Sequence, residues 1–300
     1  MSTNQLLGEI LPQIRGEYKF DFPLKRLSFI GTGGLCDLLF YPKDEEDLIY
    51  FLQNKPSNLP IICLGNFSNT LILDNGIRGC VINLSKFMTR TEPCEGYIRV
   101  DAGASLNSVI KLCIEYGISC CEKLFLIPGT IGGAIAMNAG IPEFEISDGL
   151  IDINCVNHEG KKFILNRSKI DMQYRKGNIP KNLIITSATL AIQREDKLIL
   201  TSTIDNLSKK RMTSQPIGQQ TLGSTFKNPA GLKAWKLIRK AGCENLKIGQ
   251  ASVSELHSNF LINSGDANSS DFLDLIRLIK DRVLISSGIL LEEEINIIGE

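Results

Sequence analysis

The sequence has few of the residues on which metal and hydrolase chemistry depends. It contains two histidines, His158 and His257, and its nine cysteines form an odd set without a C-x-x-C pair. A zinc site would need clustered thiolates, and a disulfide framework an even number of cysteines in a short chain. We therefore expect no metal site, and we expect most cysteines to be buried as small apolar side chains.

Excess charge of one sign and long apolar runs are also absent. Lys+Arg and Asp+Glu each total 33, so the formal net charge is zero, which argues against a general nucleic-acid binder. No segment approaches ~20 uninterrupted apolar residues, and Met1–Lys19 lacks the pattern of a signal peptide. We expect a cytoplasmic protein with no membrane insertion and no nucleic-acid partner.

Three common catalytic motifs are missing as well. There is no G-x-G-x-x-G followed by a ribose-binding acid, no G-x-x-x-x-G-K-[ST], and no G-x-S-x-G. A Rossmann dinucleotide site and a P-loop are therefore excluded. A serine triad through His257 remains formally open, although no nucleophile motif supports it.

The length of 300 residues and the 43% of hydrophobic residues predict two globular domains. We place the boundary near residue 200, after a β-rich part in which helices do not alternate regularly with strands, so the class is α+β. The expected strands are Leu38–Tyr41, Pro60–Leu64, Gly79–Leu84, Tyr97–Asp101, Leu150–Val156, Leu183–Ile192 and Glu294–Ile298; the expected helices are Asp44–Gln53, Ser105–Tyr116, Leu232–Ala241 and Ser270–Ser286.

Glycine-rich turns are the first sign of a ligand. They occur at Gly31–Gly34, at Gly65–Thr70 directly after an expected strand, and at Pro128–Ala134 before a helix-like stretch. Glycine lets backbone N–H groups approach an anion, and a helix N-terminus adds a favourable dipole. Each turn alone could be an ordinary tight turn, but together they favour a nucleotide or dinucleotide cofactor, which the glycines do not identify.

A polar, basic segment lies in the expected second domain. Between Asp205 and Gln250 there are nine Lys or Arg and only two acids. Arg211 and Lys227 flank the turn Gly223–Pro229 and would suit an anionic ligand such as a diphosphate. Ser224 in that turn could cap it or donate a proton. Near the C-terminus, strand alternation would place Glu294 on the same face as Asn296 and Ile298, and we expect this face to point inward, where a carboxylate needs a partner.

Taken in order, these segments resemble the UDP-N-acetylenolpyruvoylglucosamine reductases, flavin enzymes that complete UDP-N-acetylmuramate in peptidoglycan synthesis. The resemblance runs from about Pro23 to Gly299, and Ile127–Ala134 with Met137–Gly140 is its most specific part. The short stretch between Asn228 and Gly249 is typical of the shorter sub-class. Further matching motifs are Gly33-Gly34, Leu64–Asn69, Tyr174-Arg175, Gln215-Pro216, Gly223–Pro229, His257 with Asn259-Phe260 and Asn263, and Leu291–Gly299.

The resemblance implies a vanillyl-alcohol-oxidase-type (PCMH-type) FAD-binding domain over residues 1–200, with two subdomains divided near 85. It also implies a smaller α+β substrate-binding domain over 201–300, whose C-terminal strand contributes to the active site. Non-covalent FAD, reduced by NADPH, is the implied cofactor, and the protein is expected to be a monomer. The implied cofactor-binding residues are Gly65, Asn66, Ser68, Asn69, Pro128, Gly129, Thr130, Gly132, Gly133, Ala134 and Asn138.

The resemblance also implies catalytic roles. The enolpyruvyl group of the UDP-sugar accepts hydride from N5 of reduced FAD, Arg175 stabilises the resulting enolate, and Ser224 protonates the carbon with support from Glu294. The implied substrate-binding residues are Tyr174, Arg211, Lys227, Asn228 and His257.

The chain departs from the family pattern at three positions, since Phe67 and Leu126 replace glycines and Gly177 replaces a common serine. Phe67 could narrow the approach to the pyrophosphate and change the local backbone. Three other functions stay open: a flavin oxidase of the same fold acting on another carbohydrate, a non-catalytic nucleotide-binding module, and an RNA-binding protein, which lacks an aromatic-rich strand motif.

Overall fold

The computed structural model describes residues 3–300, so the first two residues of Met1–Lys19 and of the expected 1–200 domain lie outside it. The chain divides into two compact units. Unit 1 holds the described residues up to Phe20 together with Leu38–Asn66 and Gly79–Ser208. Unit 2 holds Asp21–Asp37, Phe67–Arg78 and Lys209–Glu300. Each unit is therefore assembled from segments that are distant in the sequence.

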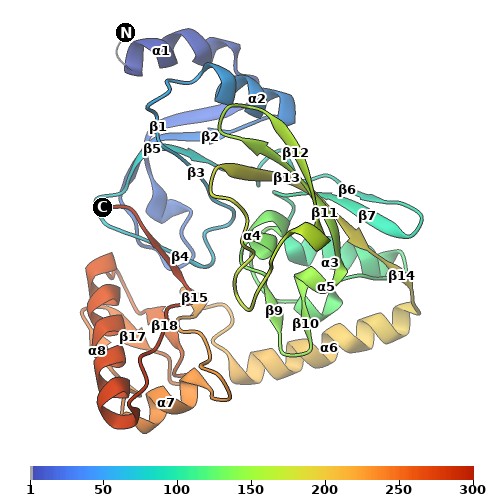
Figure 1. Ribbon diagram of the computed structural model, residues 1–300. Helices are drawn as coiled ribbons and strands as arrows, with labels where there is room; N and C mark the ends of the chain where they lie inside the picture. Colours follow the sequence, from blue (N-terminus) through green and yellow to red (C-terminus); the bar gives the residue numbers. More distant parts are fainter. Residues whose placement is uncertain (1–2) are drawn as a thin grey trace. The chain divides into compact units, whose positions relative to one another are not determined.

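The helices and strands are labelled in Figure 1. The helices are α1 Thr3–Ile10, α2 Glu45–Asn54, α3 Leu106–Glu115, α4 Ile131–Ala136, α5 Ile146–Gly149, α6 Lys197–Ser214, α7 Ala234–Lys240 and α8 Ser269–Ser287. The strands are β1 Glu17–Pro23, β2 Leu35–Tyr41, β3 Ile61–Cys63, β4 Thr70–Ile72, β5 Ile77–Ile82, β6 Thr91–Pro93, β7 Tyr97–Asp101, β8 Ile118–Ser119, β9 Gly140–Ile141, β10 Phe144–Glu145, β11 Leu150–Asn157, β12 Lys162–Asn166, β13 Leu183–Ala191, β14 Gln193–Arg194, β15 Thr221–Ser224, β16 Lys247–Ile248, β17 Ala251–Val253, β18 Phe260–Asn263 and β19 Asn296–Ile298.

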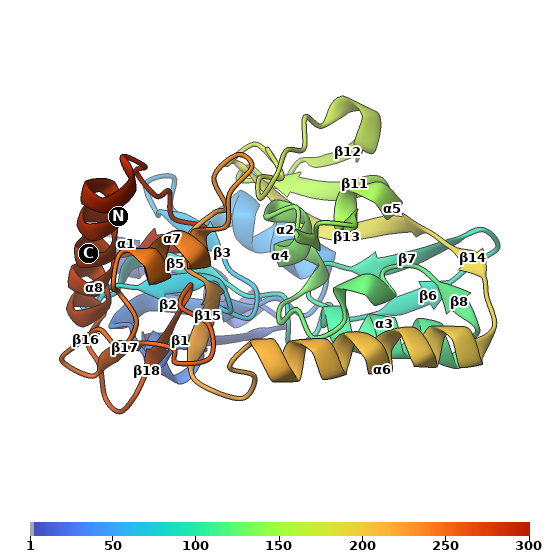
Figure 2. The ribbon, with the colours of Figure 1, turned by 90° about the horizontal axis from the view of Figure 1, so that it is seen from below.

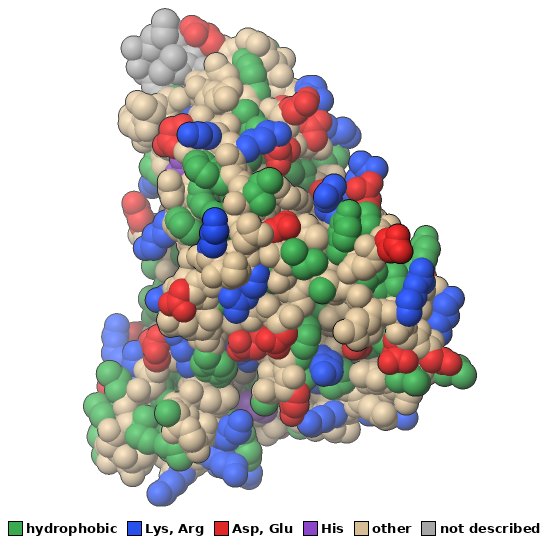
Figure 3. Space-filling model, turned by 45° about the vertical axis from the view of Figure 1, so that its right-hand side comes forward, with side chains coloured by type: hydrophobic (Ala, Val, Ile, Leu, Met, Phe, Trp, Pro, Cys, Tyr) green, Lys and Arg blue, Asp and Glu red, His purple; other side chains and the backbone are tan. Residues whose placement is uncertain are grey.

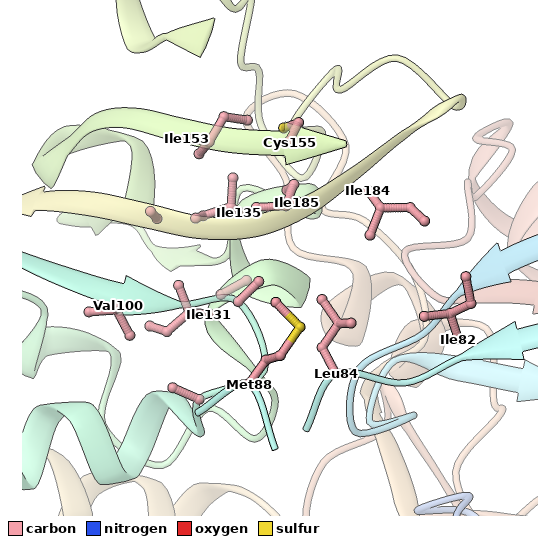
Figure 4. Packing of buried hydrophobic residues seen from close by; sticks show 14 of the residues in the cluster. Ile82, Leu84, Met88, Val100, Ile131, Ile135, Ile153, Cys155, Ile184 and Ile185 are labelled. Carbon is pink, nitrogen blue, oxygen red and sulfur yellow. The ribbon is translucent and has the colours of Figure 1, made fainter. Parts of the chain in front are cut away.

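Unit 1 is built around an antiparallel sheet with the strand order β12-β11-β13-β7-β6 and a second sheet with the order β1-β2-β5-β3. In β7 the side chains of Ile98 and Val100 are buried while Arg99 between them is exposed, as strand alternation requires. Ile131 and Ile135 of α4 point into the same apolar layer as Val100 and Ile185 (Figure 4). This packing fixes α4 and the turn that precedes it.

Unit 2 contains a four-stranded antiparallel sheet with the order β15-β18-β17-β16. Helix α8 contributes Phe272, Leu275 and Ile279 to the core of this unit. An Asn268–Asp271 capping box begins α8, and Gly288 ends it in the left-handed conformation at φ 69°. Strand β19 pairs in parallel with β4, so the C-terminal residues complete a sheet begun by Thr70–Ile72.

The α+β class is confirmed, and each strand and helix named from the sequence is present with its ends shifted by a few residues. Helix α6 was missed. It runs without a break through Lys197–Ser214 (Figure 2), a segment that the sequence indicated only as polar and close to a boundary. Its least exposed residues, Leu200, Ile204, Leu207 and Arg211, lie on one face at helical spacing. Polar side chains share this face, and the apolar Leu198, Ile199 and Met212 are exposed, so the sequence shows no clean apolar stripe with a period of 3.6.

The charged surface and the cysteines follow the composition. Basic and acidic side chains are intermingled over most of the face in Figure 3. Six of the nine cysteines are buried, which confirms their expected packing as small apolar groups. None of the helices in the described chain has both the length and the apolar character that a membrane span requires.

Candidate active site

A cavity of about 200 Å³ lies in unit 1, where the two glycine turns meet. Its lining includes Gly65 from the turn after β3, and Thr130, Gly132 and Gly133 from the turn that leads into α4. A Cβ atom on Gly65 would lie 2.5 Å from Oγ1 of Thr130, so no larger residue fits there. The structure therefore brings together these four residues, which the sequence analysis named as a group; their role in binding a cofactor stays a prediction.

Both turns contain backbone donors that the protein does not use. An N–H group that donates to no protein acceptor is available to an anionic ligand. The N–H groups of Gly65, Asn66, Gly129 and Thr130 have no acceptor within residues 3–300, and Gly65 and Thr130 line the cavity.

The first turn of α4 offers no such donors. The N–H groups of Ile131 and Gly132 donate to the carbonyl oxygens of Ala104 and Ala102, at 2.9 and 2.8 Å, and that of Gly133 donates to Oγ1 of Thr130 at 3.2 Å. The N-terminus of α4 can therefore contribute its dipole to an anion site but not these N–H groups, because the protein itself uses them. The open donors belong to the loops.

Asn83 holds the first of these loops and was missed by the sequence analysis. Its side-chain nitrogen Nδ2 donates to the carbonyl oxygens of Leu64 and Gly65, at 3.1 and 2.8 Å. Its Oδ1 accepts hydrogen bonds from the backbone N–H and the hydroxyl of Ser85, at 3.0 and 2.6 Å. In the sequence, Asn83 is marked only by its place directly after the apolar segment that forms β5.

The other expected cofactor residues are dispersed. Ser68 and Asn69 belong to unit 2, where Nδ2 of Asn69 donates to the carbonyl oxygen of Glu294 at 3.1 Å. Asn138 is buried in unit 1, and its Nδ2 donates to Oε2 of Glu145 at 2.6 Å and to the carbonyl oxygen of Gln173 at 3.0 Å. Pro128, Gly129, Ala134 and Asn66 adjoin lining residues without lining the cavity themselves. Their cofactor roles stay predictions.

Arg175 lies in a two-residue turn closed by paired backbone hydrogen bonds between Gln173 and Lys176, both near 2.9 Å. Its φ of 56° is left-handed, a strained value for a side chain of this size. The guanidinium stacks on the Tyr174 ring, with Cζ 4.9 Å from the ring centroid, and Nη2 donates to the carbonyl oxygen of Gly140 at 2.8 Å. The turn thus presents Tyr174 and Arg175 as one unit.

In unit 2 the segment Ser224–Lys227 is held between β18 and the C-terminal tail. The backbone N–H of Thr225 donates to the carbonyl oxygen of Asn259 at 2.8 Å, and its carbonyl accepts from the N–H of Glu294 at 2.8 Å. The structure therefore brings Ser224, Lys227 and Glu294 onto adjacent strands of chain. The half-buried hydroxyl of Ser224 makes no hydrogen bond with any residue of the described chain, so it is open to a ligand.

Two of the three tail acids form ion pairs with different lysines. Glu292 forms an ion pair with Lys227, and Glu293 forms one with Lys280 of α8 at 2.7 Å. Regular strand begins only at Asn296, which is exposed, so alternation does not reach Glu294. The expectation that Glu294 shares an inward face with Asn296 was therefore wrong; Glu294 is half-buried beside Thr225.

His257 and Arg211, two residues expected to bind substrate, differ in their surroundings. His257 packs edge-on against Phe260, and its Nδ1 accepts the N–H of Asn259 at 3.3 Å. Burial lowers the pKa of His257 below its ordinary value of 6.5, so the neutral ring with Nε2–H predominates near pH 7.

Arg211 is only 9% exposed, yet its guanidinium makes no hydrogen bond or ion pair with a residue of the described range. Burial lowers the pKa of Arg211, but arginine stays charged at any physiological pH. A buried cation without an anionic protein partner is suited to an anionic ligand. Asn228, by contrast, accepts the N–H of Ala234 at 3.0 Å through Oδ1 and begins the loop before α7.

The three departures from the family pattern have a backbone explanation. Phe67 and Leu126 have φ values of 55° and 66°, the left-handed conformation in which glycine is favoured, which agrees with a family pattern of glycine at both positions. The effect of Phe67 on the approach to the pyrophosphate stays a prediction. A Cβ on Gly177 would lie 2.3 Å from the carbonyl oxygen of Ile135, which excludes a serine in this conformation.

Comparisons with known proteins agree with this organisation. Residues 36–165 match the family model of the FAD binding domain, and residues 215–298 match that of the UDP-N-acetylenolpyruvoylglucosamine reductase C-terminal domain. The reductases of that name from Rickettsia massiliae and Rickettsia akari are 41% and 40% identical to the chain, over 97% of it and 98% and 99% of their own lengths. The crystal structure of the enzyme from Thermus caldophilus covers 95% of the chain and 100% of its own, with 30% identity and a TM-score of 0.82.

The α+β architecture and the FAD-domain match define a flavin-binding oxidoreductase, and they support the expected vanillyl-alcohol-oxidase-type fold. The glycine cradle and the four open N–H groups of unit 1 fit the diphosphate of FAD, its cofactor. The chain belongs to the UDP-N-acetylenolpyruvoylglucosamine reductase family.

Proposed function

We propose that the protein reduces the enolpyruvyl group of UDP-N-acetylglucosamine enolpyruvate to give UDP-N-acetylmuramate, a precursor of peptidoglycan. The observation that carries this proposal is the Ser224–Lys227 segment, in which the Ser224 hydroxyl is open and the next residue, Thr225, accepts the N–H of Glu294, in a chain related over 97% of its length to reductases of this name. NADPH is the proposed source of electrons.

The cofactor site is assigned to the two loops of unit 1. The N–H groups of Gly65, Asn66, Gly129 and Thr130 would bind the FAD diphosphate, and Asn83 would keep the first loop in place. Ser68, Asn69, Pro128, Gly132, Gly133, Ala134 and Asn138 complete the proposed cofactor set. When bound, FAD supplies the hydride that the enolpyruvyl group accepts.

The protein's own groups would handle the charge and the proton. Arg175, pre-oriented by its stack on Tyr174, would stabilise the negative charge that develops on the substrate carboxylate. Ser224 would then donate its hydroxyl proton to the substrate carbon, and Glu294 would support the hydroxyl by hydrogen bonding.

Substrate binding would use the cations of unit 2. Arg211, buried without an acidic partner, and Lys227 would bind the diphosphate, Lys227 exchanging Glu292 for the ligand. His257 would donate from Nε2, and Asn228 and Tyr174 would contact the sugar nucleotide. The protein would act as a cytoplasmic monomer without nucleic-acid partners.

An anaerobic colour experiment tests the proposal. The purified protein should be yellow, NADPH should bleach it, and the enolpyruvyl sugar nucleotide should restore the colour without oxygen. A colour that returned only with oxygen would support an oxidase of the same fold acting on another carbohydrate. Flavin that NADPH did not bleach would support a binding module without catalysis.

A further inference from the structure

Asn259 and Phe226 lie close to Ser224, the proposed proton donor. Backbone pairing between β15 and β18 ends at the Ser224–Phe260 pair, and a register irregularity lies between Thr221 and Ser224. Beyond Ser224, regular strand pairing therefore no longer fixes the chain, although Lys227 follows only three residues later.

The side chain of Asn259 continues the pairing where the backbone stops. Its Nδ2 donates to the carbonyl oxygen of Phe226 at 2.8 Å, and its Oδ1 accepts the N–H of Phe226 at 3.0 Å. Its own carbonyl accepts the N–H of Thr225 at 2.8 Å. An amide side chain thus takes the place of a peptide group and satisfies both polar groups of one residue.

Burial gives these contacts their weight. Asn259 is 4% exposed and Phe226 is 1% exposed, so water cannot replace the amide easily. On the opposite side, the N–H of Lys227 donates to the carbonyl oxygen of Glu292 at 2.9 Å. Without the Asn259 side chain the segment would keep only its backbone bonds, from Thr225 to the carbonyl of residue 259 and to the tail, and the buried Phe226 peptide would lose both partners.

We propose that Asn259 is a positioning residue for the reduction step: it acts through the Phe226 peptide to place the Ser224 hydroxyl and the Lys227 ammonium group. The inference rests on the proposed function of Ser224. Asn259 itself touches neither substrate nor cofactor in this role. It also links the segment to His257, whose Nδ1 accepts its N–H.

Asn263 provides a matched control on the same strand. It is also a buried amide, and it donates through Nδ2 to the carbonyl oxygen of Ile30 at 2.7 Å and accepts two backbone N–H groups at 3.1 Å. Asn259→Ala and Asn263→Ala should therefore cost similar stability. Only Asn259→Ala should slow reoxidation of the reduced flavin by the enolpyruvyl sugar nucleotide, by about 10- to 100-fold, as expected for a displaced reacting group.

A double-mutant cycle separates positioning from general damage. In a Ser224→Ala background, Asn259→Ala should slow reoxidation by less than about threefold further, because the group that it positions is gone. Independent multiplication of the two effects, or an equal loss in Asn263→Ala, would overturn the proposal. Asn259→Asp is the second variant: its carboxylate repels the Phe226 carbonyl, so its rate should rise on acidification as the protonated acid regains a donor.

Hydrogen exchange of the Phe226 N–H in the holoenzyme gives a readout that does not depend on the reaction. It should quicken by about tenfold or more in Asn259→Ala and stay unchanged in Asn263→Ala. Unchanged exchange in Asn259→Ala would overturn the positioning role. If the wild-type flavin were not reoxidised by the sugar nucleotide, the proposed function would fail, while the exchange result would still decide whether Asn259 holds the segment.

Discussion

The side-chain amide of Asn83 donates to the carbonyl oxygen of Gly65 at 2.8 Å and so fixes the loop through which Gly65 lines the cavity of unit 1, the proposed cofactor site. The same nitrogen reaches the carbonyl of Leu64, and the oxygen holds Ser85. One buried side chain therefore fixes the end of β3 relative to the segment after β5.

We expect Asn83→Ala to weaken FAD binding by about tenfold or more, because loss of hydrogen bonds to buried carbonyls costs roughly 1–3 kcal/mol and frees the loop. Titration of deflavinated protein with FAD measures the effect. Asn154→Ala is the control, since Asn154 bonds the hydroxyl of Ser187 in the same unit but away from the cavity lining. Equal losses in both variants would contradict a specific role for Asn83.

Cys63 should report cofactor binding. It lines the cavity and is exposed, so a reagent has access to its thiol. We expect alkylation that is faster at higher pH, where more thiolate forms, and protection when FAD is bound. Peptide mass mapping after maleimide treatment measures this, with the exposed Cys94 as the internal control. Protection of both cysteines by FAD would argue against this location.

Ser224→Ala should separate the two half-reactions. Reoxidation of the reduced flavin by the sugar nucleotide should fall by at least about 100-fold, because the proton donor is removed, whereas reduction by NADPH should change far less. Stopped-flow absorbance measures both steps. Ser252→Ala, which removes a hydroxyl paired with Ser264 in the same unit, is the matched control. Equal loss of both half-reactions would refute the role of Ser224 as proton donor.

The stability of the protein should fall on mild acidification. Burial lowers the pKa of His257 below 6.5, so near and just below pH 6.5 the unfolded chain binds a proton that the folded chain does not. Stability is therefore complete above this window and is lost as the pH falls through it. Urea unfolding between pH 7.5 and 5.5 should show a smaller loss for His257→Gln than for the wild type. Because the pKa of His158 is also lowered, chiefly by burial, some dependence should remain.

At position 126 the usual order of stability of alanine and glycine variants should be reversed. At an ordinary helical position such as Leu112 in α3, alanine is more stable than glycine by about 1 kcal/mol. At Leu126, where φ is 66°, the left-handed backbone costs roughly 1–2 kcal/mol for a residue with a Cβ, so Leu126→Gly should equal or exceed Leu126→Ala in stability. Thermal unfolding of the four variants decides the matter.

Local patterns predicted most of the regular structure. The alternation around Ile98 and Val100 and the apolar periodicity of Leu106–Glu115 appear as β7 and α3. Tyr174-Arg175 and the Gly223–Pro229 turn were found through ordered motifs, and the roles of their residues stay predictions. Helix α6 was missed because its less exposed face contains Arg211 and other polar residues, while apolar residues such as Leu198 and Met212 are exposed, so the sequence shows no clear helical period.

The supporting asparagines could not be predicted, because their partners are not close in the sequence. Asn259 bonds Phe226, and Asn83 bonds Gly65. In the sequence, an asparagine within or next to an apolar strand does not indicate whether its amide holds a functional loop. Likewise, nothing local indicates that Asp21–Asp37 and Phe67–Arg78 join Lys209–Glu300 in one unit. The linear domain boundary near residue 200 could not include such segments, and what each domain binds stays a prediction.

The parallel pairing of β4 with β19 has a consequence for synthesis on the ribosome. Thr70–Ile72 is made early, but its partner Asn296–Ile298 emerges only after nearly the whole chain. Until then Leu71 and Ile72, both fully buried in the finished protein, have no strand to pair with. The five-stranded sheet of unit 1 can form while translation continues, whereas unit 2 cannot complete its fold until its last residues have been made. Its apolar early strand is thus the part of the nascent chain most in need of protection from aggregation.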